Sequence, residues 1–193
     1  LEIVGKTDKT GTLVRFKPDA EIFKETTEFD FEILKTRLRE QAFLNAGIHI
    51  QISDERDPDN IICENFCYEG GISSFVEYLN KKKAVELVHP DIIHFSTVAD
   101  DDQATAEVAM QYNDSYNELI LSFANNIHTT DGGTHEEGFK RSLTRVMNDY
   151  ARKYNLLKDS DKNLTGDDVR EGLTVVISIK VKDAQFEGQT KAK

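Results

Sequence analysis

The end of the chain carries a side chain that is suited to phosphate chemistry. Residues 186–193 read as a glycine-hinged loop that contains Lys191. Just upstream, residues 173–182 alternate between apolar and polar side chains, which predicts a strand. A lysine held past the end of a rigid strand can reach a phosphate as a point charge. An ordinary solvated lysine is the alternative, and the residue pattern leaves both open.

A second group of charged residues lies on a predicted helix over residues 135–154. At about 100° per residue, Arg141, Arg145 and Arg152 fall within about 40° of one another. Three arginines on one exposed face can contact nucleic-acid phosphates without reading sequence. The simpler interpretation is a solvated face that keeps the helix soluble. The opposite side is expected to face the core through an apolar stripe: Phe139, Leu143, Val146, Met147 and Tyr150.

No other pattern in the sequence indicates catalysis or metal binding. No nucleophile is implied near His135, and the remaining histidines lack metal-ligand spacing. Cys63 and Cys67 have the wrong spacing for a redox pair and no second pair for zinc. We therefore expect two ordinary reduced thiols, as in cytosolic proteins. Neither of the glycine-rich phosphate-binding or dinucleotide-binding motifs occurs, so we predict no catalytic residue and no metal ligand.

Composition narrows the class of protein further. The chain has 193 residues, 38% of them hydrophobic and 31% charged, which suits one soluble globular domain. Its net charge of -11 opposes general binding to nucleic acid but allows a local basic patch. The acidic residues cluster at 54–59, 100–102 and 159–171, which we expect to be solvated loops. The apolar runs are too short to span a membrane, so we expect a cytoplasmic protein without a membrane partner.

The predicted elements form an α+β pattern that would position both charged groups. Asp30 is expected to cap a helix that Gly47 ends, and Gly70-Gly71 to open a second helix. A capping box over 134–137 is expected to begin the arginine-bearing helix, with a polar linker over 155–168 behind it. Strands are expected at 12–16, 48–53, up to Tyr68, at 92–95, 106–112 and 119–127, and at 173–182. We predict a sheet of about four strands with helices on one face.

Short motifs along nearly the whole chain, in the same order, resemble the ATPase subunits of bacterial type II topoisomerases, DNA gyrase B and its topoisomerase IV counterpart. The loop Gln189-Thr190-Lys191 is one of them. The others are Gly11-Thr12 with Val14-Arg15-Phe16, Phe43-Leu44-Asn45, Tyr68-Glu69-Gly70-Gly71-Ile72, Phe75-Val76-Glu77-Tyr78-Leu79-Asn80, Gln111-Tyr112-Asn113, Asn125-Asn126-Ile127, Gly132-Gly133-Thr134-His135 and Arg170-Glu171-Gly172.

The resemblance implies a domain organisation and a fold. Residues 1–29 correspond to the end of the family's ATPase (GHKL) domain. Residues 30–193 correspond to its transducer domain, cut after the Gln-Thr-Lys loop. The implied fold is that of ribosomal protein S5 domain 2, including a left-handed βαβ crossover that runs against the general right-handed rule.

The resemblance also implies roles for the two charged groups. In the family, the residues matching Gln189 and Lys191 contact the γ-phosphate of ATP bound in the ATPase domain. The general base and the Mg ligand lie in that absent domain, so the isolated chain is expected to be inactive. Basic side chains of the transducer partly line a cavity for double-stranded DNA, which would suit Arg141, Arg145 and Arg152. Thr130 stands where some relatives have a further arginine.

Three functional hypotheses follow. The first is a gyrase transducer that relays ATP binding and hydrolysis to DNA strand passage, with its own ATPase and TOPRIM domains and the gyrase A protein of an A2B2 enzyme as partners. The second is the same domain in topoisomerase IV, which decatenates DNA. The third is a stand-alone interaction module with an S5-like fold. The family motifs favour the first two hypotheses but do not separate them.

Overall fold

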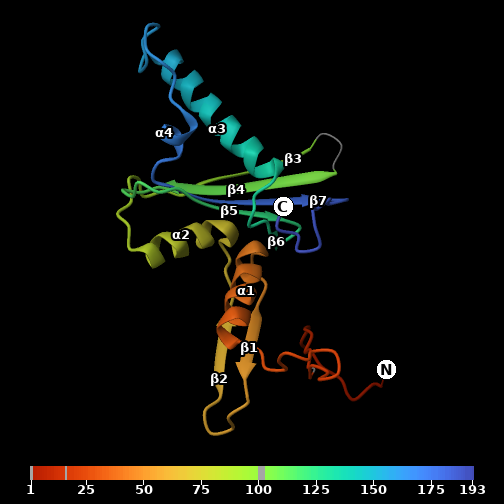
Figure 1. The fold of residues 1–193 in the computed structure, drawn as a ribbon. Coiled ribbons are helices and arrows are strands. Elements are labelled where there is room, and N and C mark those ends of the chain that lie inside the picture. The colour runs from red at the N-terminus through yellow and green to blue at the C-terminus, as the bar shows by residue number, and fades with distance from the viewer. Residues whose placement is uncertain (1, 16, 100–102) are drawn as a thin grey trace.

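The computed structural model describes residues 2–15, 17–99 and 103–193. Across these residues the fold is α+β, as predicted (Figure 1). It consists of a five-stranded mixed sheet, a separate two-stranded hairpin and helices. Within the described ranges, no helix is long and apolar enough to cross a membrane.

The long strand β7 (Leu173–Val181) forms the centre of the sheet. It pairs antiparallel with β4 (Ala104–Tyr112) and parallel with β5 (Leu119–Ala124). The outer strands are β3 (Ile93–Val98) and β6 (Ile127–His128), so the order is β3-β4-β7-β5-β6. The expectation of about four strands was one too low, because the apolar run after Leu119 turns back on itself to give β5 and β6.

Helices cover both faces of the sheet, and the expectation of helices on one face was wrong (Figure 1). On one face, α2 (Gly71–Lys83) packs its Phe75 and Val76 against Val176 of β7. On the other, α3 (Thr134–Lys153) and α4 (Gly166–Arg170) pack against Val175 and Ile177. Successive residues of a strand point to opposite faces of the sheet. A central strand with apolar side chains on both faces therefore needs a helix layer on each face to bury them.

The first helix and the hairpin form an arm that extends from the α2 side of the sheet (Figure 1). Helix α1 (Phe31–Leu44) begins at Asp30, as predicted, and the Asp30 carboxylate accepts a hydrogen bond from the Ile33 N–H at 3.1 Å. Strands β1 (Ile50–Asp54) and β2 (Ile62–Phe66) pair antiparallel beside it.

The start of α3 differs from the prediction. Its N-cap is Gly133, and no side chain caps the helix, so the capping box expected over 134–137 is absent. A complete capping box is instead formed by Thr165 and Asp168 at the start of α4. It lies in the stretch expected to be a polar linker, because the first turn of so short a helix carries few apolar residues.

Two members of the predicted apolar stripe of α3 are not in the core. Leu143 is buried, and Phe139 and Met147 pack partly against the same cluster. Val146 and Tyr150 are 57% and 55% exposed. Asn148 and Ala151 are buried instead, so the inward face of α3 is centred on Met147 and Ala151, with Val146 and Tyr150 at its edge.

The strand expected over 12–16 is not formed by residues 12–15, which have no regular secondary structure and are exposed. An isolated strand leaves its backbone groups without partners, and nothing among the described residues pairs with this stretch. Phe16 and the acidic cluster at 100–102 lie outside the described residues. The acidic loop at 54–59 connects β1 to β2 and is mostly exposed, as expected.

Candidate nucleotide-contact loop and arginine groove

The C-terminal loop is folded back on itself by backbone hydrogen bonds. The Glu187 N–H donates to the Lys193 carbonyl at 2.8 Å, and the Lys191 N–H donates to the Gly188 carbonyl at 3.0 Å. Lys191 sits at φ 56°, the left-handed region that non-glycine residues seldom occupy. The loop is therefore a closed turn that follows the rigid strand β7.

Gln189 and Lys191 are both exposed or nearly so on this turn, at the positions where the sequence places them. The Lys191 ammonium lies 5.6 Å from the centre of the Phe186 ring, a cation–π contact, and has no ion pair among the described residues. Lys193, by contrast, pairs with Glu187 at 3.1 Å. Lys191 thus offers an uncommitted positive charge, and Gln189 adds amide donors.

The turn is also tied to the start of α3. The Asp131 N–H donates to the Ala192 carbonyl at 2.8 Å. Lys193 and Arg141 line the same hollow of about 630 Å³ beside Gly132 and Gly133. Residues far apart in the sequence, the C-terminal loop and the first turns of α3, are therefore neighbours in the fold.

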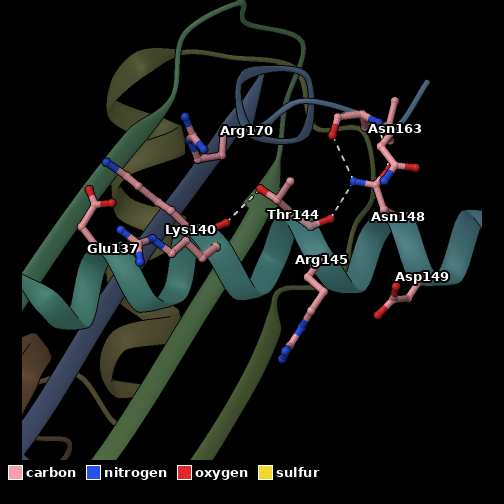
Figure 2. Close-up of a pocket in the computed structure, with 11 residues that line it drawn as sticks. Glu137, Lys140, Thr144, Arg145, Asn148, Asp149, Asn163 and Arg170 are labelled. Atoms are coloured by element: carbon pink, nitrogen blue, oxygen red, sulfur yellow. Dashed lines mark hydrogen bonds between the residues drawn. The ribbon is translucent and has the colours of Figure 1, made fainter.

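Arg141 and Arg145 line a groove of about 640 Å³ between α3 and the segment 163–170. Both are exposed, and neither forms an ion pair within the described part of the chain. Figure 2 shows Arg145 on one side of the helix, with Asn148 pointing toward Asn163 on the other. The groove thus holds two arginines without an ion pair among the described residues, and its lining also includes Glu137 and Asp149.

The other cations of the groove are already paired. Lys140 contacts Glu136 at 2.7 Å. Arg170 contacts Glu118 at 2.5 Å and Asp167 at 2.8 Å. Neither Lys140 nor Arg170 was assigned to this groove from the sequence. The segment that carries Arg170 was expected to be a linker followed by a strand.

Arg152 occupies a different environment from the other two arginines. Its guanidinium donates to the Lys158 carbonyl, to the Asp161 carbonyl at 2.6 Å and to Asn163 Oδ1 at 2.8 Å. All these acceptors lie in the loop after α3. The structure therefore places Arg152 as a clamp on that loop, at the far end of the helix from the C-terminal turn.

The sequence Arg170-Glu171-Gly172 leads directly into β7, and its glycine is in close contact with the end of β4. The Asn113 N–H donates to the Gly172 carbonyl at 2.8 Å. A Cβ at Gly172 would collide with the Asn113 carbonyl oxygen, and the φ of Gly172 is +70°. Only glycine fits this approach.

The histidines and cysteines form no metal site within the described residues. His135 Nε2 lies 3.1 Å from Thr129 Oγ1, and burial lowers the pKa of His135. Cys63 is exposed, and hydrogen bonds from Ser53 and then Gln51 lower the pKa of its thiol. His135 thus has a structural partner in Thr129.

Comparison with known proteins decides the family. Residues 71–193 match the DNA gyrase B family. The chain belongs to the DNA gyrase B family. It is 56% identical over its whole length to the DNA gyrase B protein of Halalkalibacterium halodurans and 58% identical to that of Streptococcus pneumoniae serotype 4. In both cases it spans 29% of the relative's length, so it corresponds to a part of a gyrase B protein.

Solved structures of the gyrase B family share the fold. The 43K ATPase domain of Thermus thermophilus gyrase B, in complex with an aminocoumarin, superposes with a TM-score of 0.74 at 36% identity, covering 89% of this chain and 44% of that one. The topoisomerase IV ATP-binding domain of Francisella tularensis, in complex with a small-molecule inhibitor, gives a TM-score of 0.67 at 25% identity, covering 88% and 43%. The α+β fold is thus common to both enzymes.

Proposed function

We propose that residues 30–193 are the transducer domain of a bacterial DNA gyrase B protein and that residues 1–29 are the end of its ATPase domain. The exposure of residues 12–15 and their lack of regular secondary structure support this boundary, because a strand of another domain would lack its partners here. In the whole protein this domain relays the nucleotide state to the DNA gate of a type II topoisomerase.

The nucleotide contact is made by Gln189 and Lys191. The observation that carries this proposal is the exposed ammonium of Lys191, which forms no ion pair among the described residues and lies on a turn that Asp131 ties to the start of α3. A positive charge at this place attracts the terminal phosphate of ATP and stabilises the charge that develops during its transfer. ADP lacks that phosphate, so the contact distinguishes the two nucleotides.

The chain contributes no base and no metal ligand to the reaction. ATP supplies the phosphoanhydride bond, and Mg in the whole enzyme is bound outside this chain. What this chain offers the nucleotide is hydrogen-bond donors for a phosphate, the Gln189 amide and the Lys191 ammonium. We therefore expect no ATP turnover by the isolated chain.

The partners proposed for the whole enzyme are its own ATPase and TOPRIM domains, the gyrase A protein in an A2B2 assembly, and double-stranded DNA in the cytoplasm. Arg141 and Arg145 are the proposed DNA contacts, because both are exposed in a groove that also holds Glu137 and Asp149 and neither forms an ion pair among the described residues. Arg152 supports this surface indirectly by holding the loop that borders it. The same domain of topoisomerase IV is the second candidate, favoured only by the shared fold.

Amide hydrogen exchange in the full-length gyrase B protein tests the nucleotide contact. A non-hydrolysable ATP analogue should slow exchange in a peptide covering 186–193, and ADP should not. Lys193→Ala serves as a matched control, because Lys193 is paired with Glu187, whereas Lys191→Ala should abolish the difference. Equal protection by both nucleotides would contradict a γ-phosphate contact.

A further inference from the structure

A buried polar cluster joins the start of α3 to strand β5. The Ser122 hydroxyl, 1% exposed, lies 2.7 Å from Glu136 Oε2 and 2.8 Å from the Thr129 hydroxyl. Thr129 Oγ1 in turn lies 3.1 Å from His135 Nε2. The other oxygen of Glu136 pairs with Lys140 at 2.7 Å. The cluster thus links a strand, a loop and a helix through one carboxylate.

The charge of Glu136 determines the direction of these hydrogen bonds. An ionised carboxylate only accepts, so the Ser122 hydroxyl must donate to it. The single hydroxyl hydrogen of Thr129 has two acceptors on Ser122, Oγ at 2.8 Å and the backbone carbonyl at 2.9 Å, so Thr129 Oγ1 accepts from a neutral His135 protonated at Nε2. Burial lowers the pKa of His135. Burial opposes the ionisation of Glu136, but the hydrogen bonds from Lys140 and Ser122 outweigh it and lower the pKa. The Ser122 and Lys140 donors therefore point toward Glu136, and the Thr129 hydroxyl also ties loop 129–133 to the backbone of β5.

Two glycines give these side chains room to fold back over the turn. A Cβ at Gly132 would lie 3.4 Å from Glu136 Oε2, and Gly132 has φ +75°. A Cβ at Gly133 would lie 2.9 Å from the His135 ring. The Glu136 and His135 side chains thus pack against the backbone of Gly132 and Gly133. Loop 129–133 and the first turn of α3 consequently form one unit.

The same unit holds the C-terminal turn. Between Thr129 and Gly132 stands Asp131, whose N–H donates to the Ala192 carbonyl at 2.8 Å. Ala192 directly follows Lys191. The position of the Lys191 backbone therefore depends on a loop whose other side is fastened to Glu136 through Ser122 and Thr129.

We propose that Glu136 is a positioning residue for the C-terminal turn 186–193, acting through Ser122 and loop 129–133. The proposal rests on the proposed function of Lys191. The proposal extends that function by naming the contacts through which the nucleotide-contacting turn and the arginine-bearing helix α3 move together. A shift of the turn would be transmitted to α3 at its first turn, and from there along the helix to Arg141 and Arg145.

The test is Glu136→Gln in the full-length gyrase B protein, with Glu137→Gln as the matched control. Glu137 is the next residue on α3 and is exposed, with no ion pair among the described residues. Hydrogen exchange is measured in peptides covering 129–133, 186–193 and 173–181. A hydrogen bond to a charged group corresponds to a factor of about ten in an equilibrium, so we expect about tenfold faster exchange in the first two peptides. Exchange in β7 should not change, and Glu137→Gln should change none of the three.

Nucleotide measurements separate positioning from general destabilisation. In Glu136→Gln we expect kcat for ATP to fall by about tenfold and ADP affinity to stay the same, because only the γ-phosphate contact depends on the turn. If Glu136→Gln does not fold, Ser122→Ala removes the bridging hydroxyl at almost the same volume and should give the same exchange pattern.

The outcomes distinguish the two proposals. Faster exchange at 129–133 without a change at 186–193 would overturn the positioning role. Exchange that rises equally in β7 would also overturn it, since that would indicate global loosening. If Lys191→Ala retains normal ATP hydrolysis while Glu136→Gln loosens both segments, the nucleotide contact fails and the link between the turn and α3 stands.

Discussion

Arg152 of α3 is bound to Asn163 of the following loop, with its guanidinium 2.8 Å from Asn163 Oδ1. The same guanidinium donates to the carbonyls of Lys158 and Asp161. Arg145 lies on the same helix but has no such partner among the described residues. Two arginines that the helical periodicity groups together therefore have different roles.

Arg152→Ala should destabilise the chain more than Arg145→Ala. Removing the Arg152 donors leaves loop carbonyls to be satisfied by water, and we expect a loss of about 1–2 kcal/mol in the free energy of unfolding. Arg145→Ala should lie within about 0.5 kcal/mol of the parent chain. Urea unfolding of the three chains measures both values. Equal stabilities would show that the clamp contributes nothing.

Replacing Arg141 and Arg145 with Gln should lower DNA-stimulated ATPase in the whole enzyme and leave basal ATPase nearly unchanged. Both side chains face the groove rather than the core, so folding should be retained. The loss should be greatest at low salt, where phosphate contacts are least screened. A double variant with full DNA stimulation at low salt would show that this groove does not meet DNA.

Stability should fall as the pH is lowered below about 6.5, the ordinary histidine pKa. Burial lowers the pKa of both His128 and His135 in the folded chain. Below about 6.5 the unfolded chain therefore binds more protons, and stability is lost until the pH passes the folded pKa values. Thermal unfolding between pH 7.5 and 5.5 measures the slope. The double variant His128→Gln, His135→Gln should flatten the dependence of stability on pH. An unchanged slope would show that other groups cause the pH dependence.

Cys63 should react faster with iodoacetamide at neutral pH than it does in Ser53→Ala. The thiol is exposed and its pKa is lowered, mainly by the hydrogen bond from Ser53. A larger thiolate fraction increases alkylation. Mass spectrometry of the Cys63 peptide measures the rates. Identical rates in the two chains would show that the hydroxyl does not stabilise the thiolate.

Elements with a strong local signal could be predicted from the sequence. Asp30 begins α1 because its side chain satisfies a free N–H of the first turn, a local interaction. β7 could be recognised from the alternation of apolar and polar residues along it. This signal is local and does not depend on which strands pair with it. The motifs of the family located the C-terminal turn, where Gln189 and Lys191 are exposed as expected.

The errors arose where tertiary packing decides. Val146 and Tyr150 have the right spacing for a core stripe, but the buried face of α3 runs through Leu143, Met147 and Ala151, which leaves these two residues at its edge. Thr134 has the right neighbours for a cap, but Gly133 takes that position because the chain enters the helix in a conformation suited to glycine. The contacts of Arg152 and Glu136 join segments that the sequence does not place side by side, so neither could be read from spacing.

The central claim is that Lys191 senses the γ-phosphate and that this chain relays the signal. Lys191→Ala in the whole enzyme tests it most directly, with Lys193→Ala as control because Lys193 already pairs with Glu187. Losing a donor to the charge of a transition state typically costs about 10²–10³ in rate. We predict that ATP hydrolysis and supercoiling fall together by that factor while ATP-independent relaxation of DNA persists. Hydrolysis and supercoiling at the parent rate in Lys191→Ala would contradict the account.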